Sequence, residues 1–184
     1  MATSTQLRSW WSAYKCAPAK MVRVAFPGDG RTWDLLVAAE AKPLWERFAE
    51  LMTEHGYLFR ESAGGTYNCR RISGSLSYSL HSYGTAIDLN PSKNPYKSPL
   101  THDYPEAFID AVLAEQANGK QAFRWGGRWR TPDAMHWEIN VAPADIEQPG
   151  DFWQKVYDDL QKLDPPTNET WARTLIEDFR ERKS

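Results

Sequence analysis

The sequence has little charge imbalance, few cysteines and no long apolar run. Its 184 residues include 22 lysines and arginines against 24 aspartates and glutamates, which argues against binding to nucleic acid through an overall positive charge. No run approaches the ~18 apolar residues of a transmembrane helix. Residues 1–8 lack the basic start and the apolar centre of a secretory signal. We therefore expect no nucleic-acid partner, no membrane insertion and no signal peptide.

Hydrophobic residues form 41% of the chain and supply enough apolar surface for one core. Nine tryptophans are present, and we expect most of them in that core. Cys16 and Cys69 could pair, but a chain of this length does not need a disulfide, so we expect two buried thiols. No large apolar stripe is left over once the core is assigned, which predicts a monomer.

Apolar periodicity predicts helices and short strands in irregular order. The best helical pattern covers residues 33–55, with a break at Lys42 before Pro43 and an end at Gly56. Other helices are expected at residues 7–15, 106–118, 151–163 and 169–182. Strands are expected at residues 20–26, 66–72, 85–89 and 135–141, and residues 73–82, 90–105 and 123–130 are expected to be loops. Repeated strand–helix–strand units are missing, so the pattern indicates an α+β fold with a small antiparallel sheet and flanking helices.

The segment Ser77–Asp88 is the first of two polar clusters that contain a histidine. On a strand, Asp88 shares a face with Ala86 in a stretch that otherwise has a buried pattern. A buried carboxylate needs a cation, a metal or several donors. One flat strand cannot aim His81 and Asp88 at the same point, so the chain must turn between them, and Gly84 permits that turn.

The second polar cluster covers residues 125–138. His136, Glu138 and Asn140 share one face of a predicted strand. Asp133 precedes His136 by three residues, and a short loop can fold it back toward the imidazole. The two clusters together offer two imidazoles and several carboxylates.

Two imidazoles, one carboxylate and an open position suit a catalytic zinc site. The sequence supplies His81, Asp88 and His136 as ligands and Asp133 as a base that takes a proton from the water activated by zinc. Spacing alone leaves another interpretation open. Each histidine could be an ordinary core or surface residue, and Asp133 could simply form a turn.

A family resemblance favours the zinc interpretation. The segment Ser79–Asp88 fits the pattern Ser-x-His-x-x-Gly-x-Ala-x-Asp, and the segment Asp133–Trp137 fits an acid, two residues, a histidine and an aromatic. Both resemble the signatures of the M15 zinc peptidases, which include VanY-type D,D-carboxypeptidases and phage L-alanyl-D-glutamate endopeptidases. The segment Trp125–Gly127 resembles the phage-lysin branch. The resemblance covers roughly residues 33–147, within one predicted zinc peptidase domain of residues 1–163. Residues 164–184 are expected to form a proline-containing linker and a charged helix.

The resemblance also implies roles for individual residues. Zn²⁺ would be held by three ligands, namely His81, Asp88 and His136. Asp133 would be the catalytic base, where many carboxypeptidase relatives have a glutamate. An arginine upstream of the first histidine would polarise the scissile carbonyl or its oxyanion. Arg70 fits this role better than Arg71, although both lie in range.

Further residues are expected to contact the substrate, namely Ser79, Trp125 and Trp137. Ser79 could instead orient His81 or cap a loop. Trp129 could also line the cleft, and at least one of these tryptophans should belong to the core. Glu138 could support the site or pair with an arginine. We expect His55 to be structural and His102 to be exposed.

The resemblance implies a peptidase that cuts the stem peptides of bacterial peptidoglycan. We expect an L-alanyl-D-glutamate endopeptidase that acts as a phage endolysin, accumulating in the host cytoplasm and reaching the wall through a holin pore, or carried by the virion. One alternative is a D-Ala-D-Ala carboxypeptidase, which needs a cation for the terminal carboxylate. Another is a non-catalytic wall-binding or signalling module on a hedgehog-type zinc scaffold, against which the presence of Asp133 argues.

Overall fold

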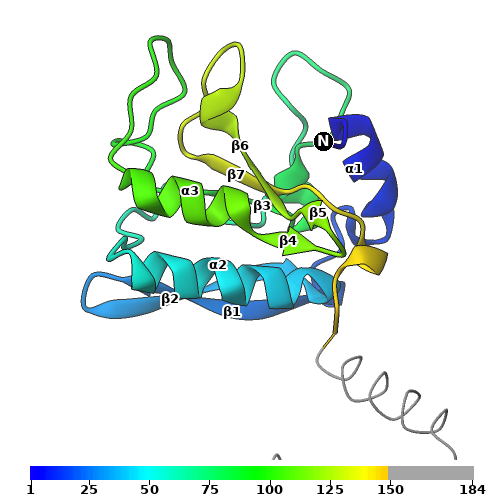
Figure 1. The fold of residues 1–184 in the computed structure, drawn as a ribbon. Coiled ribbons are helices and arrows are strands. Elements are labelled where there is room, and N and C mark those ends of the chain that lie inside the picture. Colours follow the sequence, from blue (N-terminus) through cyan, green and yellow to red (C-terminus); the bar gives the residue numbers. More distant parts are fainter. Residues whose placement is uncertain (149–184) are drawn as a thin grey trace, which may run out of the picture. The chain divides into compact units, whose positions relative to one another are not determined.

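Short helices and antiparallel strands follow one another in irregular order, as the sequence predicts (Figure 1). The computed structural model describes residues 1–148, and Met1–Ile146 form one compact unit. Its α-helices are α1 (Ser4–Trp10), α2 (Lys42–Glu54) and α3 (Glu106–Ala114). Its strands are β1 (Met21–Gly28), β2 (Arg31–Ala38), β3 (Ala86–Asp88), β4 (Gln116–Ala117), β5 (Lys120–Gln121), β6 (Phe123–Trp125) and β7 (His136–Ile139). The α+β class is confirmed.

The first two strands form a hairpin, β1–β2, that pairs along its whole length. The prediction of a helix from residue 33 is therefore wrong for residues 33–38, which lie in β2. Every residue of this stretch has a partner on β1, and Trp33 and Leu35 are half-buried on either side of the exposed Asp34. The break expected at Lys42 is confirmed, because α2 begins there with Pro43 in its first turn.

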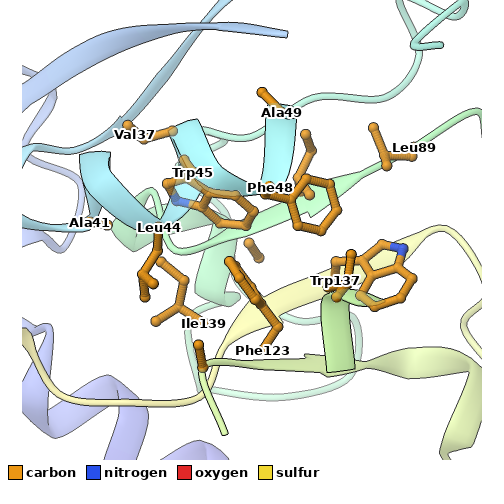
Figure 2. Close-up of a cluster of buried hydrophobic side chains, with 14 of the residues drawn as sticks. Val37, Ala41, Leu44, Trp45, Phe48, Ala49, Leu89, Phe123, Trp137 and Ile139 are labelled. Atoms are coloured by element: carbon orange, nitrogen blue, oxygen red, sulfur yellow. The ribbon is translucent and has the colours of Figure 1, made fainter. Parts of the chain in front are cut away.

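Helix α2 lies between the β1–β2 hairpin and the remaining helices and strands (Figure 1). Figure 2 shows how its residues Trp45 and Phe48 meet Phe123 and Trp137. The Phe48 ring lies 5.4 Å from that of Phe123 and 5.7 Å from that of Trp137. Burying an aromatic side chain of this kind contributes about 1.5–3 kcal/mol. This aromatic layer joins α2 to the strands that carry Phe123 and Trp137.

The central sheet has three antiparallel strands in the order β3–β7–β6. The strands expected at 85–89 and 135–141 are confirmed as β3 and β7. Residues 123–125 were expected to be loop, but they form β6 because two buried aromatics alternate with Arg124 and pair with β7. The strand expected at 66–72 does not form, and residues 66–72 have only an isolated bridge between Arg71 and Tyr78.

The helix expected at residues 106–118 ends earlier, at Ala114. The chain then forms the β4–β5 hairpin, which turns at Asn118 and Gly119. Both turn residues have positive φ angles, 49° and 69°, and Asn-Gly is a preferred pair for tight hairpins. At the start of the chain, the helix expected at 7–15 is divided into α1 and a short 3₁₀ turn.

The two cysteines form a disulfide, so the expectation of free thiols is wrong. Cys16 and Cys69 are bonded with their Cα atoms 5.1 Å apart. The backbone N–H of Cys16 also donates to the Ser82 carbonyl at 2.7 Å. The disulfide therefore ties the segment that follows α1 to the segment that precedes the first predicted metal ligand.

The predicted helices at 151–163 and 169–182, the linker and the domain boundary at residue 163 lie outside the described residues. Within residues 1–148, no helix combines the length and the apolar character that crossing a membrane requires.

Candidate metal centre

Three predicted ligands meet at one edge of the central sheet. Asp88 ends β3, His136 begins β7, and the two residues are direct partners in the antiparallel ladder. His81 comes from a 3₁₀ turn, Leu80–Tyr83, that ends at Gly84 with φ of 66°. This left-handed glycine makes the turn that the sequence requires between His81 and Asp88. One ligand atom from each of the three residues lies within 4.8 Å of the others.

Both imidazoles are held with one nitrogen facing the cluster. His81 Nδ1 donates to the Thr66 carbonyl at 2.6 Å, which leaves Nε2 free to bind a metal. His136 Nε2 lies 3.0 Å from Glu138 Oε2, so its Nδ1 faces the other ligands. Fixing the outer nitrogen in this way is typical of metal-binding histidines. A set of two imidazoles and one carboxylate fits zinc, and three protein ligands are what catalytic zinc sites use.

The ligand atoms are packed closely and share strong electrostatic interactions. Asp88 Oδ1 lies 3.0 Å from His136 Nδ1 and 3.2 Å from His81 Nε2. Burial raises the pKa of Asp88, but hydrogen bonds from His136 and His81 outweigh it and hold the pKa well below its usual range. Burial lowers the pKa of His136, but its bonds to Asp88 and Glu138 raise it to about 10. Without a metal, a proton on His136 therefore balances the Asp88 carboxylate.

Asp133 is partly buried beside this cluster and keeps one oxygen unpaired. Within residues 1–148, its Oδ1 is buried and has no hydrogen-bond partner. Burial raises the pKa of Asp133, and the charges of His136, His81 and Arg70 only partly offset that effect. A carboxylate with a free oxygen and an increased proton affinity is suited to general-base work.

The position of Asp133 depends on Gly126. The Asp133 backbone N–H donates to the Gly126 carbonyl at 3.0 Å. A Cβ at Gly126 would lie 2.5 Å from the Asp133 carbonyl oxygen and 3.3 Å from the His136 Cβ. Glycine is therefore needed after Trp125, because the lack of a Cβ lets the chain that carries Asp133 approach the end of β6.

A comparison with protein families matches residues 73–139 to the model described as D-alanyl-D-alanine carboxypeptidase, an M15 family. Over these residues the chain is similar to the M15 peptidases. M15 enzymes are zinc peptidases, and the family indicates a peptidase that acts on peptidoglycan. No curated protein sequence and no solved structure matches the chain. The matched residues include the whole ligand set and Asp133.

The two candidate arginines of the M15 site differ in their surroundings. Burial raises the pKa of Asp133, and the charge of Arg70 is one of the weaker effects that oppose this rise. The guanidinium of Arg71 lies 5.4 Å from the centre of the Tyr78 ring, a cation–π contact. Arg70 is therefore near enough for its charge to act on Asp133, whereas Arg71 contacts the Tyr78 ring.

The residues predicted to bind substrate lie in different environments. Trp137 is fully buried, Trp125 is almost so, and their rings stack 5.4 Å apart. These two tryptophans belong to the buried core, so the expectation that they contact substrate is corrected. Ser79 is buried, and its hydroxyl accepts the His81 backbone N–H at 3.4 Å as a cap. Trp129 is 39% exposed, and its ring lies 5.3 Å from that of His136.

Two supporting residues show what a sequence can and cannot signal. The sequence allows Glu138 either to support the site or to pair with an arginine, and it does both, since it contacts His136 and Arg124. Strand parity was the signal for it. Thr66 binds His81 through its backbone carbonyl, which any residue type could supply, so no sequence pattern marks it.

The other two histidines lie outside the ligand cluster. His55 follows the last residue of α2, with its ring 6.3 Å from that of Phe108. The side chain of His102 is 17% exposed, so the expectation that it is exposed is wrong. Its ring packs 5.1 Å from that of Trp125, which draws the loop before α3 onto the core.

Proposed function

We propose that the protein is a zinc-dependent peptidase that hydrolyses amide bonds in the stem peptides of bacterial peptidoglycan. The observation that carries this proposal is the pairing of His81, Asp88 and His136 with a neighbouring carboxylate that keeps a free oxygen. The M15 match supplies the substrate class. A purely structural metal site would have no use for the unpaired Asp133 oxygen.

The chain's own residues divide the work of hydrolysis. Bound zinc supplies a Lewis acid that activates water and polarises the scissile carbonyl. Asp133 takes the proton of the attacking water on its free oxygen and then passes it to the leaving amine. Arg70 stabilises the negative charge that develops on the carbonyl oxygen. Trp129, exposed beside His136, offers an aromatic surface along which the substrate backbone can lie.

We infer that the bond cut is L-alanyl-D-glutamate and that the protein acts as a phage endolysin. Asp133 in place of a glutamate and the segment Trp125–Gly127 support this choice, since both resemble the phage-lysin branch. Such an enzyme reaches the wall as a monomer through a holin pore or on the virion. The second candidate is D-Ala-D-Ala cleavage, which is favoured by the description of the matching family.

Cleavage of isolated peptidoglycan tests the proposal. The protein is incubated with and without a chelator, and the released ends are identified by mass spectrometry. New D-glutamyl or D-isoglutaminyl amino termini, lost on chelation and restored by zinc, are the expected result. Free D-alanine instead establishes the carboxypeptidase. A protein that binds one zinc and cleaves neither bond refutes the enzyme and favours the binding module.

A further inference from the structure

The carboxylate of Glu138 joins the predicted ligand His136 to Arg124. The ladder between β6 and β7 places Arg124 directly opposite Glu138. Glu138 Oε2 lies 3.0 Å from His136 Nε2, and Glu138 Oε1 accepts a hydrogen bond from Arg124 Nε. The side chains of Arg124 and Glu138 are only 13% and 2% exposed. A carboxylate buried to this degree needs a partner, and Arg124 fixes its position through this contact.

The other two nitrogens of the Arg124 guanidinium bind the segment Ala2–Ser4, which is distant in sequence. Arg124 Nη1 donates to the Ala2 carbonyl at 2.7 Å, and Nη2 donates to the Ser4 hydroxyl at 2.7 Å. Every guanidinium nitrogen therefore has an acceptor. A lysine has a single ammonium and cannot reproduce this planar fork. The orientation of Arg124 depends on this segment as well as on Glu138.

The segment Ala2–Ser4 is itself fixed at the start of α1. Thr3 caps the helix, with its hydroxyl accepting the Gln6 backbone N–H at 3.2 Å and its own N–H donating to Gln6 Oε1 at 2.8 Å. This reciprocal pair is a capping box. The backbone N–H of the segment's first residue also donates to Asn140 Oδ1 at 3.1 Å. Asn140 lies on the strand face predicted for His136 and Glu138. The segment is therefore anchored to the same face as these two residues.

We propose that Arg124 and the segment Ala2–Ser4 are positioning elements of the metal centre, acting on His136 through Glu138. The inference rests on the metal-binding part of the proposed function. The His136 Nε2–H donates to a carboxylate that is clamped in place, and Nδ1 is thereby kept facing the other two ligands. When Arg124 is lost, Glu138 is released, and the imidazole gains a freedom of rotation that metal binding must then remove.

The experiment compares Arg124→Gln with Arg47→Gln in the full chain. Arg47 also donates to several acceptors, but these are Glu50, Glu54 and Glu115, none of which is a predicted metal ligand. Zinc affinity is measured by competition with a chromophoric chelator, and stability is measured by denaturant unfolding. Arg124→Gln is expected to weaken zinc binding about tenfold or more. Arg47→Gln is expected to lower stability and leave zinc affinity unchanged.

The role of the segment is tested separately at Ser4. Ser4→Ala removes one acceptor from Arg124 and is expected to weaken zinc binding in the same direction, by less than Arg124→Gln. Ser4→Thr keeps the hydroxyl and is expected to restore the wild-type affinity. If the segment had a purely structural role, Ser4→Ala and Arg124→Gln would lower the stability of the protein without changing its zinc affinity.

A measurement without metal locates the effect on the imidazole. Nitrogen-15 spectra of the histidine rings are recorded for the metal-free wild type and for Arg124→Gln. We expect the His136 Nε2–H resonance to shift and to exchange faster with water in the variant. An unmoved resonance overturns the inference, and so does a zinc affinity in Arg124→Gln that equals that of the wild type or of Arg47→Gln.

The outcomes separate this inference from the proposed function. A wild-type chain that binds zinc but cleaves no peptidoglycan overturns only the enzyme, and the Arg124 comparison still decides the positioning role. A wild-type chain that binds no zinc overturns both.

Discussion

Asp88 and His136 stand directly opposite each other across the β3–β7 ladder, with Asp88 Oδ1 3.0 Å from His136 Nδ1. Backbone pairing alone brings these two side chains to one edge of the sheet. The third residue, His81, reaches the same point from a 3₁₀ turn. The centre is thus built mostly from rigid elements, which suits a site that must keep its geometry through a reaction.

Replacing Asp88 by asparagine removes the negative ligand and keeps the side-chain shape. We expect zinc affinity to fall by more than the ~10–100-fold that follows loss of a residue that only supports a ligand. The exposed residue Asp110 on α3 provides a matched control, since Asp110→Asn makes the same chemical change elsewhere. Equal zinc affinity of the two variants, measured by chelator competition, would exclude Asp88 as a ligand.

Zinc binding should release protons at neutral pH. The pKa of His136 is raised to about 10 when no metal is bound, so the imidazole carries a proton at pH 7 that a metal must displace. Below pH 10, the apparent zinc affinity is therefore expected to increase with pH, by about tenfold per unit for one proton. Calorimetry in two buffers that differ in ionisation enthalpy counts the protons. A binding heat that is independent of buffer would contradict the assignment.

Asp133→Asn should separate catalysis from metal binding. Asparagine cannot accept the proton, and general-base catalysis contributes about 10²–10⁴-fold in rate. We expect a loss of this size in kcat with an unchanged zinc affinity, and full activity in Asp110→Asn. The wild-type rate should also decline on the acid side at a pH above the ordinary pKa of an aspartate, because burial raises that of Asp133. A variant that retains wild-type kcat would remove Asp133 from the mechanism.

Gly126→Ala is expected to displace the base. The new Cβ would lie 2.5 Å from the Asp133 carbonyl oxygen, so the backbone there must move. Activity should decrease by at least tenfold, since small shifts of catalytic groups are costly. Gly30→Ala serves as the control, because Gly30 has a positive φ of 65° but no atom within 4 Å of the added Cβ. It should lower stability alone, and equal activity losses in both variants would refute the steric argument.

Removing the disulfide should lower stability and leave the metal centre intact. Cys16 and Cys69 are 53 residues apart, and closing a loop of that length stabilises a fold by about 4 kcal/mol in the chain-entropy account. Denaturant unfolding of the double serine variant, and of wild type with and without a reductant, measures this difference. Equal stability of wild type and variant would show that the bond does not form in solution.

The grouping of His81, Asp88 and His136 could be predicted from the sequence because the signals for it are local. Asp88 and His136 lie on strands short enough for parity to fix their faces, and Gly84 marks the turn that aims His81. Strand parity also placed Glu138 beside His136. The placement of these residues needs only the period of a strand and the conformational freedom of glycine, whereas their role as metal ligands rests on the family resemblance.

Contacts between distant parts of the chain could not be predicted from the sequence. The partner of Glu138 is Arg124, in a segment expected to be loop, which pairs only because β7 lies beside it. Residues 33–38 look helical when joined to α2, and only the pairing with β1 makes them a strand. The disulfide likewise depends on how Cys16 and Cys69 approach in space. In each case the deciding contact joins distant parts of the chain.

Zinc-dependent cleavage of peptidoglycan tests the central claim most directly. Metal-free protein is titrated with zinc in the presence of isolated peptidoglycan, and the new amino termini or free D-alanine are counted at each addition. The account predicts that release starts from zero, rises with zinc and reaches its plateau at one zinc per chain. Release that persists in the absence of metal, or no release with one zinc bound, would contradict it.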